Sequence, residues 1–379
     1  MHLVIYQPRV SYYVGGGEVV PLEQARYLSR MGWSVTILTS KAPFLEESDY
    51  FTQFKAANPK VEIKYLTIPT KLKWIYKTEP GINWERWDQE SLAFAKLALP
   101  LLNQFRYNKS IIAVHNILDT QGVPVSVPSV LHLHGFPSQL NYACQLLLNQ
   151  PQNLVSVSSH IKDKYVSFGV RSAITVHTNG ISAKDFYPIE IAKQYDLLYI
   201  GRLVEIKGVQ YLLQAVANLV HKKEHKDVKV AIAGQGPYRE YLVSLVKKYQ
   251  IGANIFFLGY IPEEEKNALY NQSRIVVLPS YAREGVLTTM LEASACGVPV
   301  VTCRNTSMAE FIRSNKNGVL VEPEDSESLE KAIRHLLASP ELAGSLGKEA
   351  RRDVLKNWTW ETKAKELAHY YRSVCPTRI

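Results

Sequence analysis

Short runs of apolar residues recur along the chain, and amphipathic stretches of helical length separate them. The runs are rich in valine and isoleucine and are mostly unbroken by polar residues, which is typical of strands covered on both faces. The alternation of such strands with helices predicts parallel sheets built from right-handed βαβ units. A first series of runs comprises Leu3–Tyr6, Val35–Leu38, Val61–Leu66, Ile111–Val114, Val130–Leu133, Leu154–Val157 and Ile174–Val176, and a second comprises Leu197–Ile200, Val228–Ala233, Ile255–Leu258, Ile275–Leu278 and Val298–Val301.

The two series are separated by Ser182–Tyr195, which carries charge, Pro188 and no strong periodicity, and which we predict to be a linker. With 379 residues, the chain is also longer than one average domain of roughly 150 residues. We therefore expect an α/β protein with two doubly wound, Rossmann-like domains, residues 1–183 and 184–357, facing each other across a cleft. A ligand is expected there, at the carboxyl ends of the strands. The amphipathic tail, residues 358–379, is expected to form a helix that packs back on the first domain.

The composition, with 46% hydrophobic and 21% charged residues, is that of a globular protein and excludes a disordered, collagen-like or coiled-coil chain. The four cysteines form no C-x-x-C motif, so they predict reduced thiols in a cytoplasmic protein. The first residues do not resemble a signal peptide, and no apolar run approaches the ~20 residues that cross a bilayer. We expect a soluble protein, or one that at most lies on the inner face of a membrane.

The net charge is +9, from 44 lysines and arginines against 35 aspartates and glutamates, and it permits an anionic partner without identifying one. Six lysines between Lys55 and Lys77 stand against one acidic residue, Glu62, and give +5, which equals the surplus of residues 1–183. The charge is therefore concentrated, and no nucleic-acid-binding module accompanies it. A basic nucleic-acid-binding protein is the disfavoured alternative.

The first segment with recognisable chemistry is Gly15-Gly16-Gly17-Glu18, between the first predicted strand and a helix predicted over Val19–Met31. Glycines at such a turn let the backbone approach a ligand closely, and a helix N-terminus favours negative charge. Val20 occupies the place of the third glycine of G-x-G-x-x-G, which disfavours a dinucleotide. We place Pro21 in the first helical turn, where proline is tolerated. A tight turn without a ligand is the alternative.

Two cations, Arg202 and Lys207, stand in the segment Gly201–Gly208 after the first strand of the second domain. Together they have the charge to neutralise a diphosphate without a metal ion. Charges that face only solvent in a loop are the alternative.

Two carboxylates frame the segment from Glu284 to Glu292, and the next helix is expected to begin near Thr288. Glu292 then lies one turn into that helix, on the face of Thr288. Carboxylates accept hydrogen bonds from hydroxyl groups, while the amides of a helix N-terminus hold an anion. The pattern suits a ligand with several hydroxyls and a phosphate, whereas ordinary surface charge on a helix is the alternative.

His132 and His134 end a strand of the first domain, and their alternation places both imidazoles on one face. A zinc site is disfavoured because no third histidine, cysteine or acid follows at ligand spacing. The two remaining interpretations are a packed histidine and one that contacts a substrate.

Basic and aromatic residues mix in the stretch Thr67–Ser91, which we expect to be a loop on the acceptor side. Such a mixture suits a membrane headgroup layer or a lipid diphosphate, although a solvated insertion with locally packed aromatics is equally consistent. The aromatic candidates are Trp74, Tyr76, Trp84 and Trp87.

Taken in order, these segments resemble glycosyltransferase family four, nucleotide-sugar enzymes of the GT-B fold. In the first domain the G-G-x-E turn and Asn179-Gly180 fit the family. The chain departs from its pattern at Leu287, where the family often has Gly or Pro, and this position lies beside the donor sugar. The second domain carries G-R-x4-K-G at Gly201–Gly208, G-x-G-P at Gly234–Pro237, F-x-G at Phe257–Gly259, P-S at Pro279–Ser280 and E-x7-E-A-x-A-x-G-x-P-V at Glu284–Val300.

The resemblance implies a role for each of these positions. Arg202 and Lys207 would bind the donor diphosphate and stabilise the leaving group, and Glu292 would hold the ribose. Glu284 would hold the sugar, and His134 would contact the donor sugar or the acceptor hydroxyl. The remaining donor-binding positions would be Gly16, Gly17, Gly234, Gly236, Gly285, Val286, Leu287 and Thr288.

The resemblance also implies a retaining, metal-independent hexosyltransferase without a cofactor, similar to bacterial and cyanobacterial exopolysaccharide enzymes. The expected donor is UDP-glucose, and the expected acceptor is a saccharide or lipid-linked saccharide in polysaccharide assembly. The alternatives are a GDP-mannose-dependent mannosyltransferase, a UDP-sugar epimerase of the same fold and a degenerate sugar-binding subunit. The intact set of Arg202, Lys207, Glu284 and Glu292 argues against the last of these.

Overall fold

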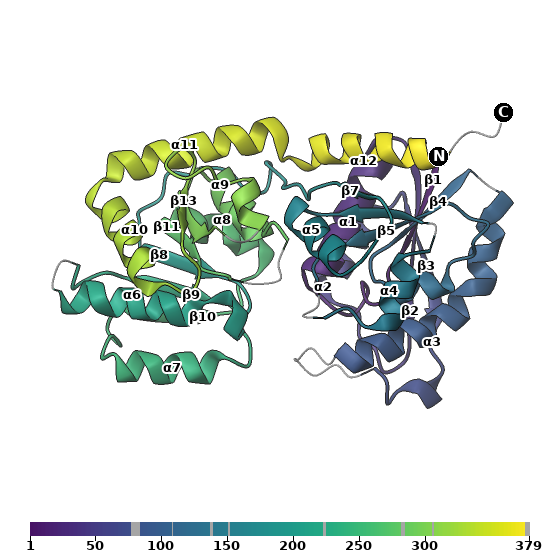
Figure 1. Cartoon of the computed structure of the whole chain (residues 1–379), viewed down its shortest axis with the longest axis horizontal. Coiled ribbons are helices and arrows are strands. Elements are labelled where there is room, and N and C mark those ends of the chain that lie inside the picture. The colour runs from purple at the N-terminus through teal and green to yellow at the C-terminus, as the bar shows by residue number, and fades with distance from the viewer. Residues whose placement is uncertain are drawn as a thin grey trace. The chain divides into compact units, whose positions relative to one another are not determined.

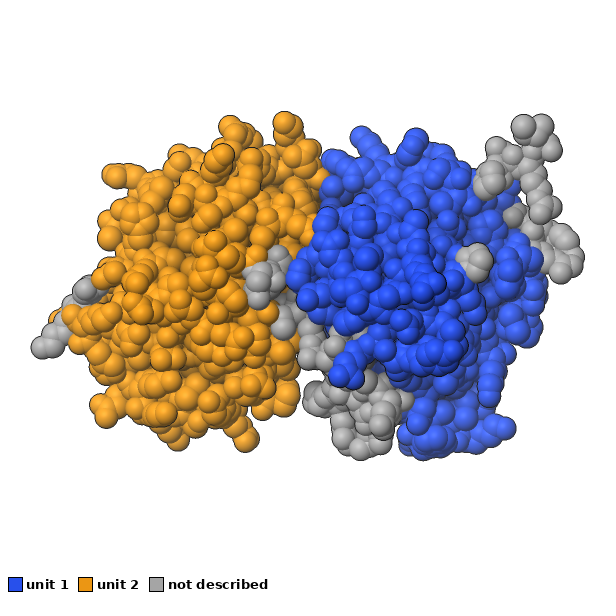
Figure 2. All heavy atoms as spheres, in the orientation of Figure 1, with its two compact units in different colours: residues 1–179, 360–379 blue, residues 180–359 orange. Residues whose placement is uncertain are grey.

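The protein is described by a computed structural model, which defines residues 1–76, 84–107, 109–136, 139–150, 152–222, 225–281, 285–304 and 307–375. The chain forms two compact units, which Figure 2 shows in different colours. One consists of Met1–Asn179 together with Trp360–Ile379, and the other of Gly180–Thr359. The change between units therefore falls a few residues before the predicted boundary at residue 183, and the last helix belongs to the first unit.

The first unit contains a parallel sheet with the strand order β3-β2-β1-β4-β5-β6-β7. Each of the seven apolar runs predicted for this half forms one of these strands, so that prediction is confirmed. The strands are β1 (His2–Tyr6), β2 (Ser34–Lys41), β3 (Val61–Thr67), β4 (Ser110–Val114), β5 (Ser129–Leu133), β6 (Asn153–Ser156) and β7 (Ile174–Val176).

Helices cover both faces of this sheet because successive strand residues point to opposite sides. Leu3 and Ile5 of β1 pack in one cluster with residues of α1 and α12, and Val4 and Tyr6 pack in another with residues of α3 and α5. The helices of this unit are α1 (Gly16–Arg30), α2 (Asp49–Ala57), α3 (Trp84–Leu102), α4 (Tyr142–Leu148), α5 (Ser159–Ser167) and α12 (Trp360–Val374), with 3-10 turns η1 (Thr70–Leu72), η2 (Asn103–Tyr107) and η3 (Leu118–Gly122).

The C-terminal helix α12 lies beside α1 in the first unit, as Figure 1 shows. Trp360 stacks on Tyr27 with ring centroids 6.3 Å apart. The hydroxyl of Tyr371 is 2.8 Å from Nε2 of His132 on β5. The prediction that the tail packs back on the first domain is confirmed.

The second unit repeats the same strand order, β10-β9-β8-β11-β12-β13, with parallel pairing throughout. All five predicted runs are present, and β13 is a sixth strand that the pattern missed because only Val321 of its three residues is buried. The elements are β8 (Tyr195–Ile200), β9 (Val230–Ala233), β10 (Ile255–Gly259), β11 (Ser273–Leu278), β12 (Val300–Cys303), β13 (Val319–Val321), α6 (Val209–His221), α7 (Arg239–Lys248), α8 (Glu263–Asn271), α9 (Thr288–Ala295), α10 (Ser326–Ala338), α11 (Pro340–Asn357), η4 (Glu205–Lys207) and η5 (Ser307–Glu310).

Two local predictions need correction. The segment predicted as a linker is bound to the second unit, because the backbone amides of Tyr187 and Ile189 donate to side-chain oxygens of Asn267 and Asn271 at 3.0 Å each. The stretch Thr67–Ser91 is not a loop throughout, because α3 already begins at Trp84. Among the described residues, no helix is both long and apolar enough to cross a membrane.

Candidate functional site

The loop between β8 and α6 carries the two predicted cations and is bound to the neighbouring loop after β11. Tyr281 donates its backbone N–H to the carbonyl of Ile206 at 3.1 Å, and Oγ of Ser280 donates to the same oxygen at 3.2 Å. Gly208 has φ +71°, and a Cβ there would lie 2.1 Å from the carbonyl oxygen of Pro279. Only glycine fits such a left-handed position against another backbone, so the loop requires glycine at position 208.

The two predicted cations differ in exposure. Lys207 is 8% exposed and lies at the end of η4, immediately before Gly208. Arg202 is exposed, and within the described residues its side chain takes part in no hydrogen bond or ion pair. Its backbone carbonyl accepts from the Tyr199 hydroxyl at 2.8 Å, which holds the loop while the guanidinium stays available.

The glycines after β9 bring a third loop against the first. A Cβ on Gly234 would lie 1.9 Å from the carbonyl oxygen of Gly201, and one on Gly236 would lie 2.2 Å from that of Leu203. Leu203 donates its N–H to the carbonyl of Gln235 at 2.8 Å. Gly234 and Gly236 therefore let two loops meet backbone to backbone, and their predicted contact with a donor stays a prediction.

Besides these loops, the candidate site of the second unit contains Glu292, which is buried on α9. The helix begins at Thr288, as expected, with Leu287 at the N-cap. Oε2 of Glu292 accepts from the Tyr270 hydroxyl at 2.6 Å, and Oε1 lies 3.9 Å from Nζ of Lys266. Burial raises the pKa of Glu292, and the charge of Lys266 opposes that rise. A carboxylate held in this way has a fixed position relative to the helix N-terminus.

The rest of the predicted acidic segment is placed only in part. Glu284 lies outside the described residues. Val286 is buried in the core of the second unit, Leu287 packs against that core, and Gly285 and Thr288 are half-buried. Val286 thus anchors the loop, and a contact of its backbone with a sugar stays a prediction.

In the first unit, three imidazoles gather at the carboxyl ends of β4 and β5. His132 and His134 share one face of their strand, with near-parallel rings 6.2 Å apart, as predicted. The sequence did not point to His115, which follows β4 and places its Nδ1 2.8 Å from Nε2 of His134. It also lies 4.7 Å from the ring of His132. The sequence could have indicated His115 only through its position directly after the predicted strand Ile111–Val114.

Burial makes all three imidazoles poor bases. It lowers the pKa of His134 to about 4, and it lowers the pKa values of His115 and His132 well below their ordinary values, helped by the neighbouring imidazoles. No third ligand stands at ligand spacing beside His132 and His134 in the sequence, but the fold brings His115 next to them from the end of another strand. The rings stack face to face, however, and in the described part of the chain no three His, Cys, Asp or Glu side chains are arranged to hold a metal ion. Metal independence stays a prediction.

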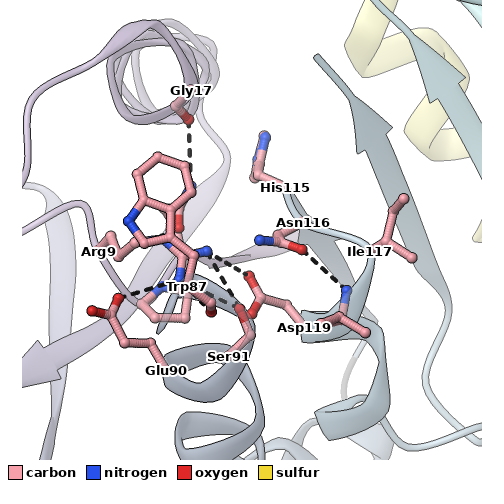
Figure 3. Close-up of polar contacts among 12 residues, drawn as sticks. Arg9, Gly17, Trp87, Glu90, Ser91, His115, Asn116, Ile117 and Asp119 are labelled. Atoms are coloured by element: carbon pink, nitrogen blue, oxygen red, sulfur yellow. Dashed lines mark hydrogen bonds and ion pairs between the residues drawn. The ribbon is translucent and has the colours of Figure 1, made fainter. Parts of the chain in front are cut away.

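The glycine turn of the first unit begins α1 at Gly16, with Gly15 as the N-cap. Pro21 is therefore inside the helix, which corrects the prediction that it occupies the first turn. Proline has no N–H to donate to the carbonyl four residues earlier. That carbonyl, on Gly17, instead accepts from Nε2 of Gln7 at 3.3 Å, a bond drawn in Figure 3. A Cβ at Gly17 would meet no atom within 4 Å, so open space adjoins it.

A buried charge cluster that the sequence did not reveal lies beside this turn (Figure 3). Arg9, in the loop after β1, is 2% exposed and stands over the Trp87 ring at 5.1 Å. Its guanidinium nitrogens lie 3.5 Å from Glu90 of α3 and 3.9 Å from Asp119 of η3. Burial raises the pKa of Asp119 to about 6, although the charge of Arg9 opposes this.

The aromatic residues predicted for the acceptor side occupy different environments. Trp74 is 65% exposed, and Tyr76 is buried in the core beside Tyr12 and Phe44. Trp87 packs on Arg9, so it contributes to the charge cluster. Trp84 begins α3, and its side chain lies outside the described residues.

Comparison with known proteins gives matches for both halves of the chain. Alignment with a GDP-mannose-dependent alpha-(1-6)-phosphatidylinositol monomannoside mannosyltransferase of Mycolicibacterium smegmatis shows 30% identity over 238 residues, 58% of this chain and 62% of that protein. The chain spans about half the length of the curated relatives it matches.

Two solved structures share the fold over almost the whole chain. Sucrose-phosphate synthase from Thermosynechococcus elongatus has a TM-score of 0.80 at 21% identity and covers 98% of both chains. Anabaena HepE in complex with UDP-glucose has a TM-score of 0.77 at 16% identity and covers 98% of this chain and 100% of that one. Residues 14–185 match the family described as Glycosyltransferase Family 4, and residues 183–353 match the Glycosyl transferases group 1. The chain therefore belongs to the glycosyltransferases of the GT-B fold that combine these two domains.

Proposed function

We propose that the protein transfers a hexose from a nucleotide diphosphate sugar to a saccharide or lipid-linked saccharide, with retention of the anomeric configuration. The observation that carries this proposal is the presence of a buried cation, Lys207, in the loop after β8 and of a buried carboxylate, Glu292, on the helix α9 that follows the neighbouring strand β11. A diphosphate requires the first and the ribose hydroxyls the second. Both positions match the family motifs.

The proposed reaction breaks the bond between C1 of the sugar and the phosphate oxygen, and it forms a bond from C1 to the acceptor oxygen. The leaving diphosphate takes the proton of the acceptor hydroxyl. Negative charge that develops on the diphosphate is stabilised by Lys207, which is buried beside the loop backbone, and by the available guanidinium of Arg202. His134, neutral at neutral pH because its pKa is about 4, contacts the sugar or the acceptor hydroxyl through a hydrogen bond.

UDP-glucose is the proposed donor. The fold is shared with HepE, whose structure contains UDP-glucose. GDP-mannose is the second candidate, and it is favoured by the 30% identity to a mannosyltransferase that is named for that donor. We place the protein in the cytoplasm, where its free cysteines, among them buried Cys296 and Cys303, would stay reduced.

A panel of nucleotide sugars tests the donor. We expect UDP-glucose to raise the midpoint of thermal unfolding in a saturable way, because a ligand that binds only the folded state stabilises it. Slow release of UDP from UDP-glucose without an acceptor would then identify the transferred group. A larger shift with GDP-mannose would make GDP-mannose the favoured donor in place of UDP-glucose. Conversion of UDP-glucose into another UDP-sugar without an acceptor would favour the epimerase, and absence of any shift would contradict the proposal.

A further inference from the structure

A pocket of about 300 Å³ lies in the first unit, at the carboxyl ends of β1, β2 and β3. Its walls include Ser11 and Tyr12 from the loop after β1, Lys41 at the end of β2 and Tyr65 near the end of β3. Glu47, in the loop before α2, and Lys55, on α2, complete it. This volume is at the lower end of the range for small-molecule sites, and the edge of a parallel sheet where strands end is where such folds bind ligands.

The floor of the pocket is held in place by hydrogen bonds. Oγ of the buried Ser11 donates to the carbonyl of Ser40 at 2.8 Å, and the Ser11 carbonyl accepts from the N–H of Ser48 at 2.9 Å. The hydroxyl of Tyr12 donates to Glu90 at 3.0 Å. The backbone on three sides is therefore fixed before any ligand arrives, as a selective site requires.

The pocket has one positive charge in excess. Lys55 is paired with Glu47, and its Nζ lies 3.2 Å from the Tyr65 hydroxyl. Burial alone would raise the pKa of Glu47, but hydrogen bonds from Lys55 and Tyr65 outweigh burial and lower it. Lys41 stands 5.2 Å from the centre of the Tyr65 ring, and within the described residues its ammonium has no hydrogen bond or ion pair. The ammonium of Lys41 thus lies on an aromatic face without a hydrogen-bonded partner among the described residues, and the carboxylate of Glu47, whose pKa both lysines help to lower, offsets only one of the two positive charges.

We infer that this pocket binds an oxyanion, a phosphate or a carboxylate, carried by the acceptor. The assignment of this oxyanion to the acceptor rests on the proposed function. It is supported by the position of the pocket, which shares one sheet edge with the imidazoles within the first unit. His134 follows directly after β5, which lies three strand intervals from β2, and intervals of about 4.8 Å place it about 14 Å from the end of β2. The anionic group is therefore not on the hydroxyl-bearing ring that reacts but farther along the acceptor.

Inorganic phosphate is the first probe, and its binding is measured by calorimetry on the full chain in the Lys207→Ala background. That background removes a cation of the donor site, to which phosphate would otherwise also bind. We expect saturable binding that Lys41→Gln weakens about tenfold, since a hydrogen bond to a charged group is lost. The matched control is Lys60→Gln, an exposed lysine between α2 and β3 that makes the same change in net charge outside the pocket.

A second arm distinguishes the source of the oxyanion. Binding is compared for phosphatidylcholine vesicles with and without phosphatidylglycerol. The proteins are the Lys207→Ala background and the same background with Lys41→Gln or Lys60→Gln. Binding that needs the anionic lipid and is weakened by Lys41→Gln, but not by Lys60→Gln, assigns the pocket to a lipid headgroup. Phosphate binding with no vesicle binding assigns it to a soluble acceptor. Both outcomes support the inference.

The inference is overturned if phosphate does not bind, or if Lys41→Gln and Lys60→Gln bind phosphate alike. This failure is separable from failure of the proposed function, because release of UDP from UDP-glucose in the otherwise unchanged protein needs only the donor site. Lys41→Gln is expected to leave that release at its original rate. A loss of UDP release in every variant, with phosphate binding intact, would instead remove the proposed function and keep an anion site of another kind.

Discussion

The two units share one strand order but form the carboxyl edges of their sheets by different means. In the second unit, backbone meets backbone: Gly208 lies against Pro279, and Gly234 lies against Gly201. In the first unit, side chains fill the edge: Arg9 bridges Glu90 and Asp119, and His115 contacts His134. The edge of the second unit depends on where glycines stand, and the edge of the first unit depends on charges and rings from distant parts of the chain.

The difference has an energetic consequence. Close backbone contact costs little once glycine is present, whereas buried charges retain a desolvation cost that their partners offset only in part. In the first unit, burial outweighs the attraction of Arg9 and leaves the pKa of Asp119 raised. We therefore expect changes to the edge of the second unit to affect activity and packing, and changes to the edge of the first unit to alter the dependence of stability on pH.

The largest effect is expected for Lys207→Ala. Loss of one fixed donor that stabilises developing negative charge typically lowers kcat by about 10²–10³, or about 3–4 kcal/mol. We expect that loss in steady-state transfer with a verified donor, and a similar one for Arg202→Ala. The control is Lys226→Ala, an exposed lysine before the amino end of β9, where no donor is expected. Near-normal turnover of Lys207→Ala would remove the donor assignment.

Gly208→Ala examines the backbone contact itself. A left-handed φ for alanine, together with a Cβ 2.1 Å from the Pro279 oxygen, should lower the free energy of unfolding by about 2–4 kcal/mol. Gly344→Ala is the matched control, because Gly344 lies inside α11 with nothing within 4 Å of a Cβ. We expect that control to stabilise by about 0.5–1 kcal/mol. Urea denaturation measures both, and equal effects would show that backbone approach at Gly208 is not required.

Asp119→Asn examines the buried charges of the first unit. The folded state holds the Asp119 proton up to a pH of about 6, whereas the unfolded chain releases it near the ordinary value of 3.8. The folded state therefore binds more protons within this window, and stability falls as pH rises through it, by about 2–3 kcal/mol. The variant should lack this fall and leave Arg9 paired with Glu90.

The measurement is urea denaturation of both proteins at several pH values between about 4 and 7. The difference between them isolates Asp119, because the other carboxyl groups are common to both. Asp163→Asn, an exposed change on α5, controls for the loss of a carboxylate. A difference that stays constant over the window would show that Asp119 titrates as it does in the unfolded chain.

The contrast between the edges also explains what the sequence could predict. The strands of both sheets were predicted because burial on two faces leaves a continuous apolar run, and only β13, with one buried residue, escaped. The motif loops of the second unit were predictable because Gly201, Lys207 and Gly208 are near neighbours in the chain. Their local spacing carries the information.

The first edge was not predictable in the same way, because Arg9, Glu90 and Asp119 meet only after three elements pack together. Each looks like an ordinary surface charge in the sequence. Tyr76 and Trp87 were assigned to an acceptor for the same reason, since an aromatic residue in a charged stretch does not reveal whether it faces solvent or core. His115 needed the strand order, which places β4 beside β5.

The smallest effect is expected for Tyr371→Phe, which removes one hydroxyl between α12 and the imidazoles. Tyr371 and His132 are both buried, so the change leaves Nε2 of His132 without its partner at 2.8 Å. An unsatisfied buried group of this kind costs about 1–2 kcal/mol in the free energy of unfolding. Tyr142→Phe, at an exposed hydroxyl of the same unit, should change it by less than about 0.5 kcal/mol. Because the nucleotide is expected to bind Lys207 and Glu292 of the second unit, whereas Tyr371 belongs to the first, the affinity for UDP should not change. A weakened affinity for UDP would mean that the two edges are coupled through α12.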